Sequence, residues 1–75
     1  MTVAERVLPR DQYFTALGEA IQRARWDKGW SQVRLASEVG VESGACISYW
    51  EAGIHRPDAW MIDRLERLFG RRLRP

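Results

Sequence analysis

Arginine is the most abundant side chain with functional chemistry in this sequence of 75 residues, which contains eleven Arg and a single Lys. A guanidinium group pairs with two phosphate oxygens at once, so an arginine-rich chain suits nucleic-acid contact, although a GC-rich coding sequence produces the same bias. Residues 1–10 carry a net +1 (two Arg against one Glu), residues 11–53 a net −2 (four basic against six acidic) and residues 54–75 a net +3 (six Arg against three acidic). The composition is therefore compatible with nucleic-acid binding but does not establish it. The excess of basic residues lies at the two ends of the sequence.

Side chains for covalent catalysis or metal binding are sparse. Cys46 is the single cysteine and His55 the single histidine, so neither an internal disulfide nor a set of soft metal ligands is available. No nucleophile, base and orienting group stand together as in an active site, so we expect neither enzyme activity nor a cofactor. The chain starts without an apolar run of signal-peptide length and has no stretch near the roughly 20 apolar residues of a membrane span, which predicts a soluble cytoplasmic protein.

Hydrophobic periodicity predicts an all-α chain. From Asp11 as N-cap, apolar residues at spacings of three and four predict an amphipathic helix that stops at Gly29. Ser31 is expected to cap a second helix, QVRLASEV, whose end is marked by Gly40. These signals define the first half of the domain.

The third and fourth predicted helices follow the same logic. The third runs from about Ser43, its expected cap, to Glu51, and Gly53 closes it. Pro57 is expected to open the fourth, because the N–H that proline lacks has no helical partner in the first turn. The apolar stripe of this helix is predicted to comprise Trp60, Met61, Leu65, Leu68 and Phe69, ending at Gly70.

One compact bundle of four to five helices is predicted for the whole chain. Thr2 and Glu5 have capping-box spacing, so residues 1–10 are expected to form an N-terminal arm or a short helix. Residues 11–70 make up the domain, and residues 71–75 a basic C-terminal tail.

The joint between the second and third predicted helices has the layout of a helix-turn-helix. Ala36 is the small residue that a steep crossing requires at the contact, and Gly40 permits the positive φ that reverses the chain. Val41, Ile47 and Trp50 are expected to hold the third helix against the body. Its outer face would then stand free, and an α-helix fits the major groove of B-DNA.

The order of motif residues over residues 14–70 resembles the Cro/C1-type (XRE) family of helix-turn-helix regulators of phages and bacteria. The pattern LGEAIQRARWDKGWSQVRLASEVGV is followed by ISYWEAG and then RPDAWMIDRLERLFG. The resemblance implies a lambda-repressor-like bundle with a central helix-turn-helix at about residues 31–52. The matching residues are Leu17, Gly18, Ile21, Arg25, Gly29, Ser31, Gln32, Leu35, Ala36, Gly40, Ile47, Ser48, Trp50, Glu51, Gly53 and Pro57.

By the same resemblance, the chain is expected to be a sequence-specific transcriptional regulator that binds double-stranded DNA, with a repressor as the leading interpretation. It would insert helix 43–52 into the major groove of a palindromic or pseudo-palindromic operator in the nucleoid. An antitoxin-like module that covers a protein partner and also binds its own operator is the alternative.

Two departures from the family pattern stand out. Five residues, ESGAC, separate Val41 from Ile47 where the family usually has four, so the turn or the start of the third helix holds one extra residue. The chain also ends soon after Gly70, without the fifth helix that many members have and that provides a common dimerisation surface. We therefore expect a monomer or weak dimer that dimerises on adjacent half-sites or through its N-terminal segment.

Family members commonly pair an arginine late in the first helix with the glutamate that follows the apolar anchor of the third. In this sequence those positions are Arg25 and Glu51, so the resemblance implies an interior ion pair; two separate solvated charges are the alternative. Because desolvation offsets much of the attraction, the pair is expected to position the third helix more than to stabilise the fold.

The face of the third helix that would meet DNA follows from a rotation of about 100° per residue from the buried Ile47. The outer face then carries Ala45, Tyr49 and Ala52, with Gly44 and Ser48 on the flank. Alanine can touch a thymine methyl and serine can hydrogen-bond, but neither makes the bidentate contacts that discriminate strongly, so DNA shape is expected to contribute. The predicted base-facing set is Ser43, Gly44, Ala45, Ser48, Tyr49 and Ala52.

Phosphate contacts are predicted around the same helix. Gln32 resembles the family residue that binds a backbone phosphate and braces the third helix, and His55 and Arg56 match the family's backbone-contacting loop. Each of these side chains could instead be an ordinary solvated group. The predicted phosphate set is Gln32, Arg34, His55, Arg56, Arg6 and Arg10.

The tryptophans and the cysteine have structural and functional interpretations. Trp30, Trp50 and Trp60 lie at family core positions and are expected to pack inside, whereas Trp26 is expected to be partly exposed. Stacking on single-stranded nucleic acid is the functional alternative. Cys46 is expected to be a small packing residue, with a redox switch as the alternative.

Overall fold

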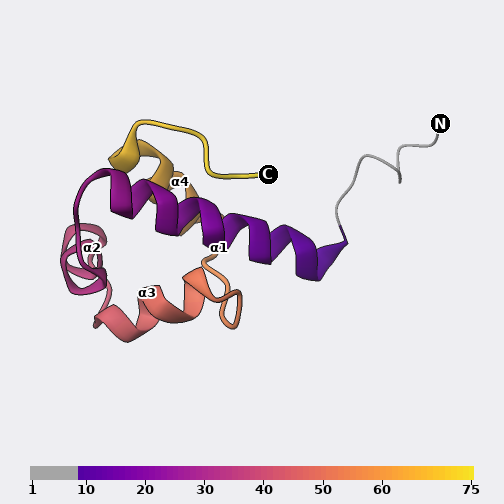
Figure 1. The fold of residues 1–75 in the computed structure, drawn as a ribbon, viewed down its shortest axis with the longest axis horizontal. Helices are drawn as coiled ribbons and strands as arrows, with labels where there is room; N and C mark the ends of the chain where they lie inside the picture. Colours follow the sequence, from indigo (N-terminus) through magenta and orange to yellow (C-terminus); the bar gives the residue numbers. More distant parts are fainter. Residues whose placement is uncertain (1–8) are drawn as a thin grey trace.

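Four α-helices account for most of residues 9–75, the part of the chain that the computed structural model describes. They are α1 (Arg10–Asp27), α2 (Gln32–Val39), α3 (Gly44–Glu51) and α4 (Ala59–Phe69). No strand occurs among these residues, which confirms the prediction of an all-α bundle. In Figure 1, α1 runs along the molecule, and α2 and α3 lie below it. The predicted N-terminal arm or helix, together with Arg6, falls outside the described residues.

Helix α1 begins two residues earlier than the sequence predicts. Pro9, not Asp11, holds the N-cap position, and Arg10 is the first helical residue. The Pro9 carbonyl accepts a hydrogen bond from the Tyr13 N–H at 2.9 Å, so the helix starts directly after the proline. Asp11 lies in the first turn, where its carboxylate interacts favourably with the helix dipole. Arg10 therefore belongs to the helical body and not to an arm.

The ends of α2 and α3 follow the sequence signals closely. The Ser31 Oγ accepts from the Arg34 N–H at 3.0 Å, and Gly40 ends α2 with a φ of 83°. That left-handed conformation is one that glycine adopts without strain. Ser43 precedes α3 as predicted, although its side chain makes no capping hydrogen bond. Both helices therefore have the bounds that their terminal residues predict.

Helix α4 starts two residues later than predicted. Asp58, not Pro57, precedes it, and the Asp58 Oδ1 accepts from the Met61 N–H at 2.8 Å, which is a stronger start signal than proline alone. Trp60 then lies in the first turn with 66% of its surface exposed, so its assignment to the core is wrong. Ile62, absent from the predicted stripe, is buried together with Leu65.

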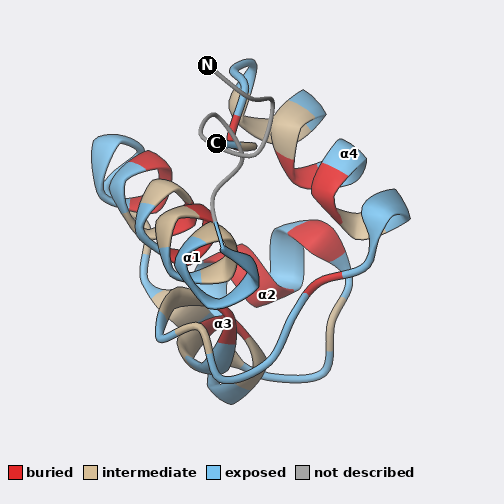
Figure 2. Ribbon diagram, turned by 90° about the vertical axis from the view of Figure 1, so that its right-hand side faces the viewer, coloured by how far each residue is buried: buried red, intermediate tan, exposed pale blue. Residues whose placement is uncertain are grey.

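The core fills the space between the four helices. Its buried side chains come from every helix, and buried positions face inward on each of them (Figure 2). Trp50 is buried, as predicted, and Trp30 is half-buried with its ring 6.1 Å from that of Phe69. Trp26 is exposed. The buried apolar residues are Leu17, Ile21, Ala24, Leu35, Ala36, Val39, Ile47, Trp50, Ile62, Leu65 and Leu73.

Residues 71–75 pack against the helices. Leu73 is only 3% exposed, so the predicted basic tail contributes a core residue. The Glu66 carboxylate accepts the backbone N–H groups of Leu73 at 2.8 Å and Arg74 at 3.1 Å. The Arg71 Nη1 lies 2.7 Å from the Asp27 carboxylate, which ties this segment to the end of α1.

Candidate nucleic-acid interface

The five residues between Val41 and Ile47 form the end of the turn and the first residues of α3. The N–H groups of Gly40 and Val41 both donate to the Ala36 carbonyl, at 2.9 and 3.0 Å, and close the end of α2. Helix α3 begins at Gly44, three residues before Ile47, and Ser43 is extended. The turn therefore extends to Ser43, and α3 starts within one residue of its predicted first position.

At Gly44 the start of α3 lies close to the first turn of α2. A β-carbon at Gly44 would lie 3.1 Å from both the backbone N and the Cγ2 of Val33. The α-carbon of Gly44 therefore faces the first turn of α2 on this side, and its contact with a base stays a prediction. Rotation about the axis of α3 placed Gly44 on the flank of that helix without taking the neighbouring α2 into account.

Gly18 allows α1 and α3 to approach at backbone distance. A β-carbon at this position would lie 2.4 Å from the Trp50 carbonyl oxygen and 2.7 Å from that of Glu51. No side chain fits there without moving one of the helices. The sequence pattern included Gly18 as a motif residue, but its role depends on a contact that only the folded chain shows.

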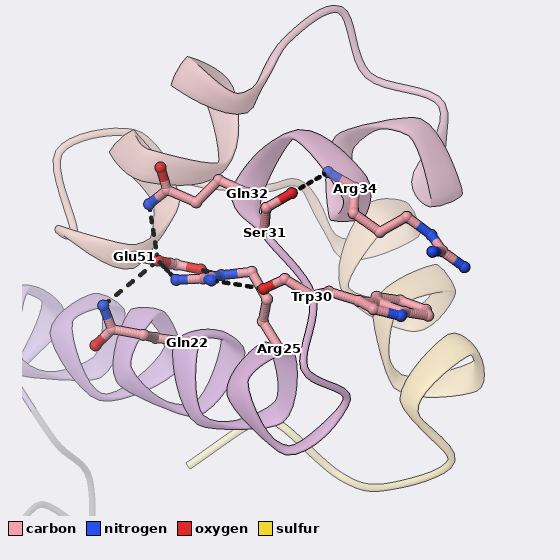
Figure 3. Close-up of polar contacts among 7 residues, drawn as sticks. All are labelled: Gln22, Arg25, Trp30, Ser31, Gln32, Arg34 and Glu51. Carbon is pink, nitrogen blue, oxygen red and sulfur yellow. Dashed lines mark hydrogen bonds and ion pairs between the residues drawn. The ribbon is translucent and has the colours of Figure 1, made fainter.

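An ion pair joins α1 to the end of α3 (Figure 3). The Arg25 Nε donates to the Glu51 Oε2 at 2.6 Å, and the Arg25 Nη2 donates to the Glu51 Oε1 at 3.0 Å. The two side chains are 9% and 3% exposed, so this is the interior pair that the resemblance implied. The hydrogen bond to Glu51 raises the pKa of the Arg25 guanidinium, burial opposes that shift, and the Glu51 charge adds to it.

Two glutamines and a backbone carbonyl complete the polar network around this pair. The Gln32 Nε2 donates to the Glu51 Oε1 at 3.1 Å, and the Gln22 Nε2 approaches the same oxygen at 3.5 Å. The Arg25 Nη1 donates to the Trp30 carbonyl at 2.8 Å. Gln32 thus braces α3 from the first turn of α2, as expected. Gln22 and the Trp30 carbonyl were not predicted, because the sequence carries no signal for either contact.

The outer side of α3 is small and uncharged. Ala45 and Ala52 are exposed, Ser43 is exposed just before the helix, and Ser48 is half-buried. Tyr49 is 44% exposed, and its ring meets that of His55 edge-to-face with centroids 4.9 Å apart. Of the predicted base-facing residues, Ser43, Ala45, Ser48, Tyr49 and Ala52 therefore lie on this side of α3, and Gly44 adjoins Val33 at the start of α2.

The predicted phosphate residues are more dispersed. The Arg34 Nε pairs with the Glu38 carboxylate at 2.8 Å, and its guanidinium lies 5.0 Å from the Trp30 ring centre. The Arg56 guanidinium lies over Phe14 of α1, 4.6 Å from its ring centre. Arg10 is exposed at the start of α1. His55 and Arg56 flank the end of α3, whereas Arg34 is on α2 and Arg10 is remote in sequence.

Two exposed apolar side chains near α3 were not predicted. Val33, in the first turn of α2, is 70% exposed, and Ile54, in the loop after α3, is 65% exposed. A shallow surface hollow of about 460 Å³ lies along the same side of α3. Its lining residues are Gly40, Val41, Glu42, Ser43, Ala45, Cys46, Tyr49 and His55.

Cys46 is half-buried at the edge of this hollow. Burial raises the pKa of its thiol, and the negative charge of Glu42 raises it further. Both effects disfavour the thiolate, the form that reacts in redox chemistry. The environment of Cys46 thus favours the packing interpretation.

Residues 9–75 contain no group of three or more His, Cys, Asp or Glu side chains placed to hold a metal ion. Within the same part of the chain, no helix has both the length and the apolar character that a membrane crossing requires. In comparisons with models of protein families and with curated proteins, neither a family model nor a curated protein matches the chain.

Proposed function

We propose that this chain is a sequence-specific regulator of the lambda-repressor-like helix-turn-helix type, which binds double-stranded DNA by placing α3 in the major groove. The observation that carries the proposal is the contrast between the two sides of α3. Its inner side is held by Ile47, Trp50 and the Arg25–Glu51 pair, whereas its outer side is free and small enough for deep insertion.

Phosphate contacts would come from the groups around α3. The first-turn N–H groups of α2 at Gln32 and Val33 have no partner within the helix, and a helix N-terminus attracts phosphate. Arg56 and His55 follow α3, and Arg34 can exchange Glu38 for a phosphate because that pair is exposed. With two or three cationic contacts, we expect the logarithm of affinity to fall against the logarithm of salt with a slope of about −2 to −3.

Regulation would be repression, because a small domain that occupies an operator blocks access to it without contacting polymerase. We expect the protein to be a monomer or weak dimer at micromolar concentration and to pair on the two half-sites of a palindromic operator. Light scattering tests this expectation. A tight dimer that persists after deletion of residues 1–10 would contradict it.

Selection of bound sites from random duplexes tests the proposal directly. We expect an enriched palindrome or pseudo-palindrome, bound at least a hundredfold more tightly than a scrambled duplex of equal length at the same salt concentration. Recovery of unenriched sequences, with equal affinity for both duplexes, would contradict sequence-specific binding.

A second candidate is an antitoxin-like module that covers a protein partner with the same face. The exposed Val33 and Ile54 and the absence of basic side chains on α3 favour it, because apolar patches are typical of protein interfaces. Co-purification with the product of a neighbouring gene tests this alternative. Under either function we propose that the chain is not an enzyme.

A further inference from the structure

We infer that α3 and the first turn of α2 read thymine methyl groups, so that the preferred DNA sites place thymines where Ala45 and Val33 enter the major groove. This inference rests on the proposed function and names the chemical feature of the DNA that the same surface recognises. It follows from which side chains on that surface are available to contact a base and which are held by other contacts.

The usual hydrogen-bonding readers of bases are absent from this surface or engaged elsewhere. Guanine is read by Arg or Lys and adenine by Asn or Gln, each through two hydrogen bonds. Helix α3, with the sequence GACISYWE, contains none of these four residue types. The Gln32 Nε2 donates to the buried Glu51, and Arg34 is assigned to a phosphate contact under the proposed function.

Two exposed aliphatic side chains remain where α2 and α3 begin. Val33 is 70% exposed, and its Cγ2 lies beside the start of α3, 3.1 Å from the position that a Gly44 β-carbon would occupy. Ala45, the next residue of α3, is exposed on the outer side and lines the hollow. Two aliphatic side chains therefore flank the N-terminal end of α3, with only a glycine between the two helix starts.

The thymine 5-methyl is the apolar group that the major groove presents. Contact with it buries apolar surface on both partners and needs no hydrogen-bonding side chain, which matches Val33 and Ala45. Burial of one methyl group is worth about a fourfold change in affinity. Ser48 and Tyr49 supply hydroxyl groups further along α3, so the methyl contacts are assigned to its first turn.

Single replacement of each thymine by deoxyuridine in the selected duplex tests the inference, because it removes only the methyl group. We expect one or two positions in each half-site at which the dissociation constant rises about fourfold. At the position read by Ala45, the Ala45→Ser variant should bind the thymine and deoxyuridine duplexes almost equally. Val33→Ser should do the same at a neighbouring position.

Ala59→Ser, the same chemical change at an exposed residue of α4, is the matched control and should keep the full thymine preference. If the wild-type protein binds the selected duplex specifically but tolerates deoxyuridine at every position, the inference is wrong while the proposed function stands. If the thymine preference is present but survives in both Ala45→Ser and Val33→Ser, the assignment to these residues is wrong. If no duplex is bound with preference, the proposed function itself fails.

Discussion

The two sides of α3 differ in how many contacts they make with the rest of the chain. The inner side contacts two other helices: α1, at Gly18 and through the Arg25 guanidinium at Glu51, and the start of α2 through Gln32. The outer side carries small or hydroxyl-bearing residues, and the ring of His55 packs on that of Tyr49. The position and angle of α3 are thus specified by packing, while the residues it presents can vary without cost to the fold.

Removal of the buried carboxylate should have the largest effect on the inner side. Glu51→Ala leaves Arg25 charged and without its partner in the interior, and we expect it to lower the free energy of unfolding by on the order of 3 kcal/mol in urea titrations. Glu38→Ala removes an exposed partner of Arg34 and should cost less than about 1 kcal/mol. A loss below about 0.5 kcal/mol for Glu51→Ala would show that the pair does not fix α3.

Closing the gap between α1 and α3 should have the next largest effect. Alanine normally favours a helix over glycine, but the added methyl of Gly18→Ala would overlap the Trp50 and Glu51 carbonyl oxygens. We expect a loss of about 2 kcal/mol of unfolding free energy. Gly44→Ala, with a 3.1 Å contact, should be nearly neutral because helix propensity offsets the crowding. Equal stability of the two variants would contradict the close approach at Gly18.

The outer side should affect binding and leave stability unchanged. Tyr49→Ala should weaken binding to the selected site by about 1 to 3 kcal/mol and leave random duplexes and their salt slope nearly unaffected. Arg56→Ala should weaken both classes of duplex alike and reduce the magnitude of the slope by about one. Fluorescence anisotropy at several salt concentrations separates the two. If Tyr49→Ala weakens both classes equally, Tyr49 contacts the backbone and not a base.

The smallest effect on stability is expected at the C-terminal segment, residues 71–75. There the Glu66 carboxylate is a second carboxylate held by hydrogen bonds, and it can be compared with that of Glu51. The backbone N–H of Leu73 lowers the pKa of Glu66 below its ordinary 4.5, against the opposing effect of burial; the Arg74 N–H and the charges of Arg74 and Arg72 lower it further. A carboxyl with a depressed folded-state pKa stabilises the fold above its ordinary pKa, and this stabilisation is lost as the pH falls through the folded value. Glu66→Gln should therefore reduce the decline in unfolding free energy below about pH 4.5. An unchanged pH profile would show that Glu66 does not hold the segment.

Local signals in the sequence predict most of the backbone. Ser31 and Gly40 bound α2 because caps and left-handed glycines act within one turn, and Ile47 and Trp50 are buried as their spacing predicts. Where two start signals compete, the sequence does not decide between them, and the choice of Pro57 over Asp58 misplaced the start of α4. The same pattern assigned Trp60 to the core, although it lies exposed in the first turn.

Contacts between distant segments were predicted only where a motif carried them. Arg25 and Glu51 were paired through the family resemblance, but the convergence of Gln22 on the same carboxylate depends on the helix packing. The closeness of Gly44 to Val33 was not predicted, because rotation about one helix takes no account of the next. Leu73 was assigned to a basic tail, since a single apolar residue among arginines gives no signal of burial.

The central claim is that the outer side of α3 is the surface that meets DNA, and amide chemical shifts measured during titration with the selected duplex test it most directly. We predict that the largest changes, at saturating duplex, occur at Ala45, Ser48, Tyr49 and Ala52, while the amides of residues 71–74 on the C-terminal segment stay within the scatter of the remaining core. Changes concentrated on α4 and the C-terminal arginines, with α3 unaffected, would contradict the account and move the DNA-binding surface to the basic end of the chain.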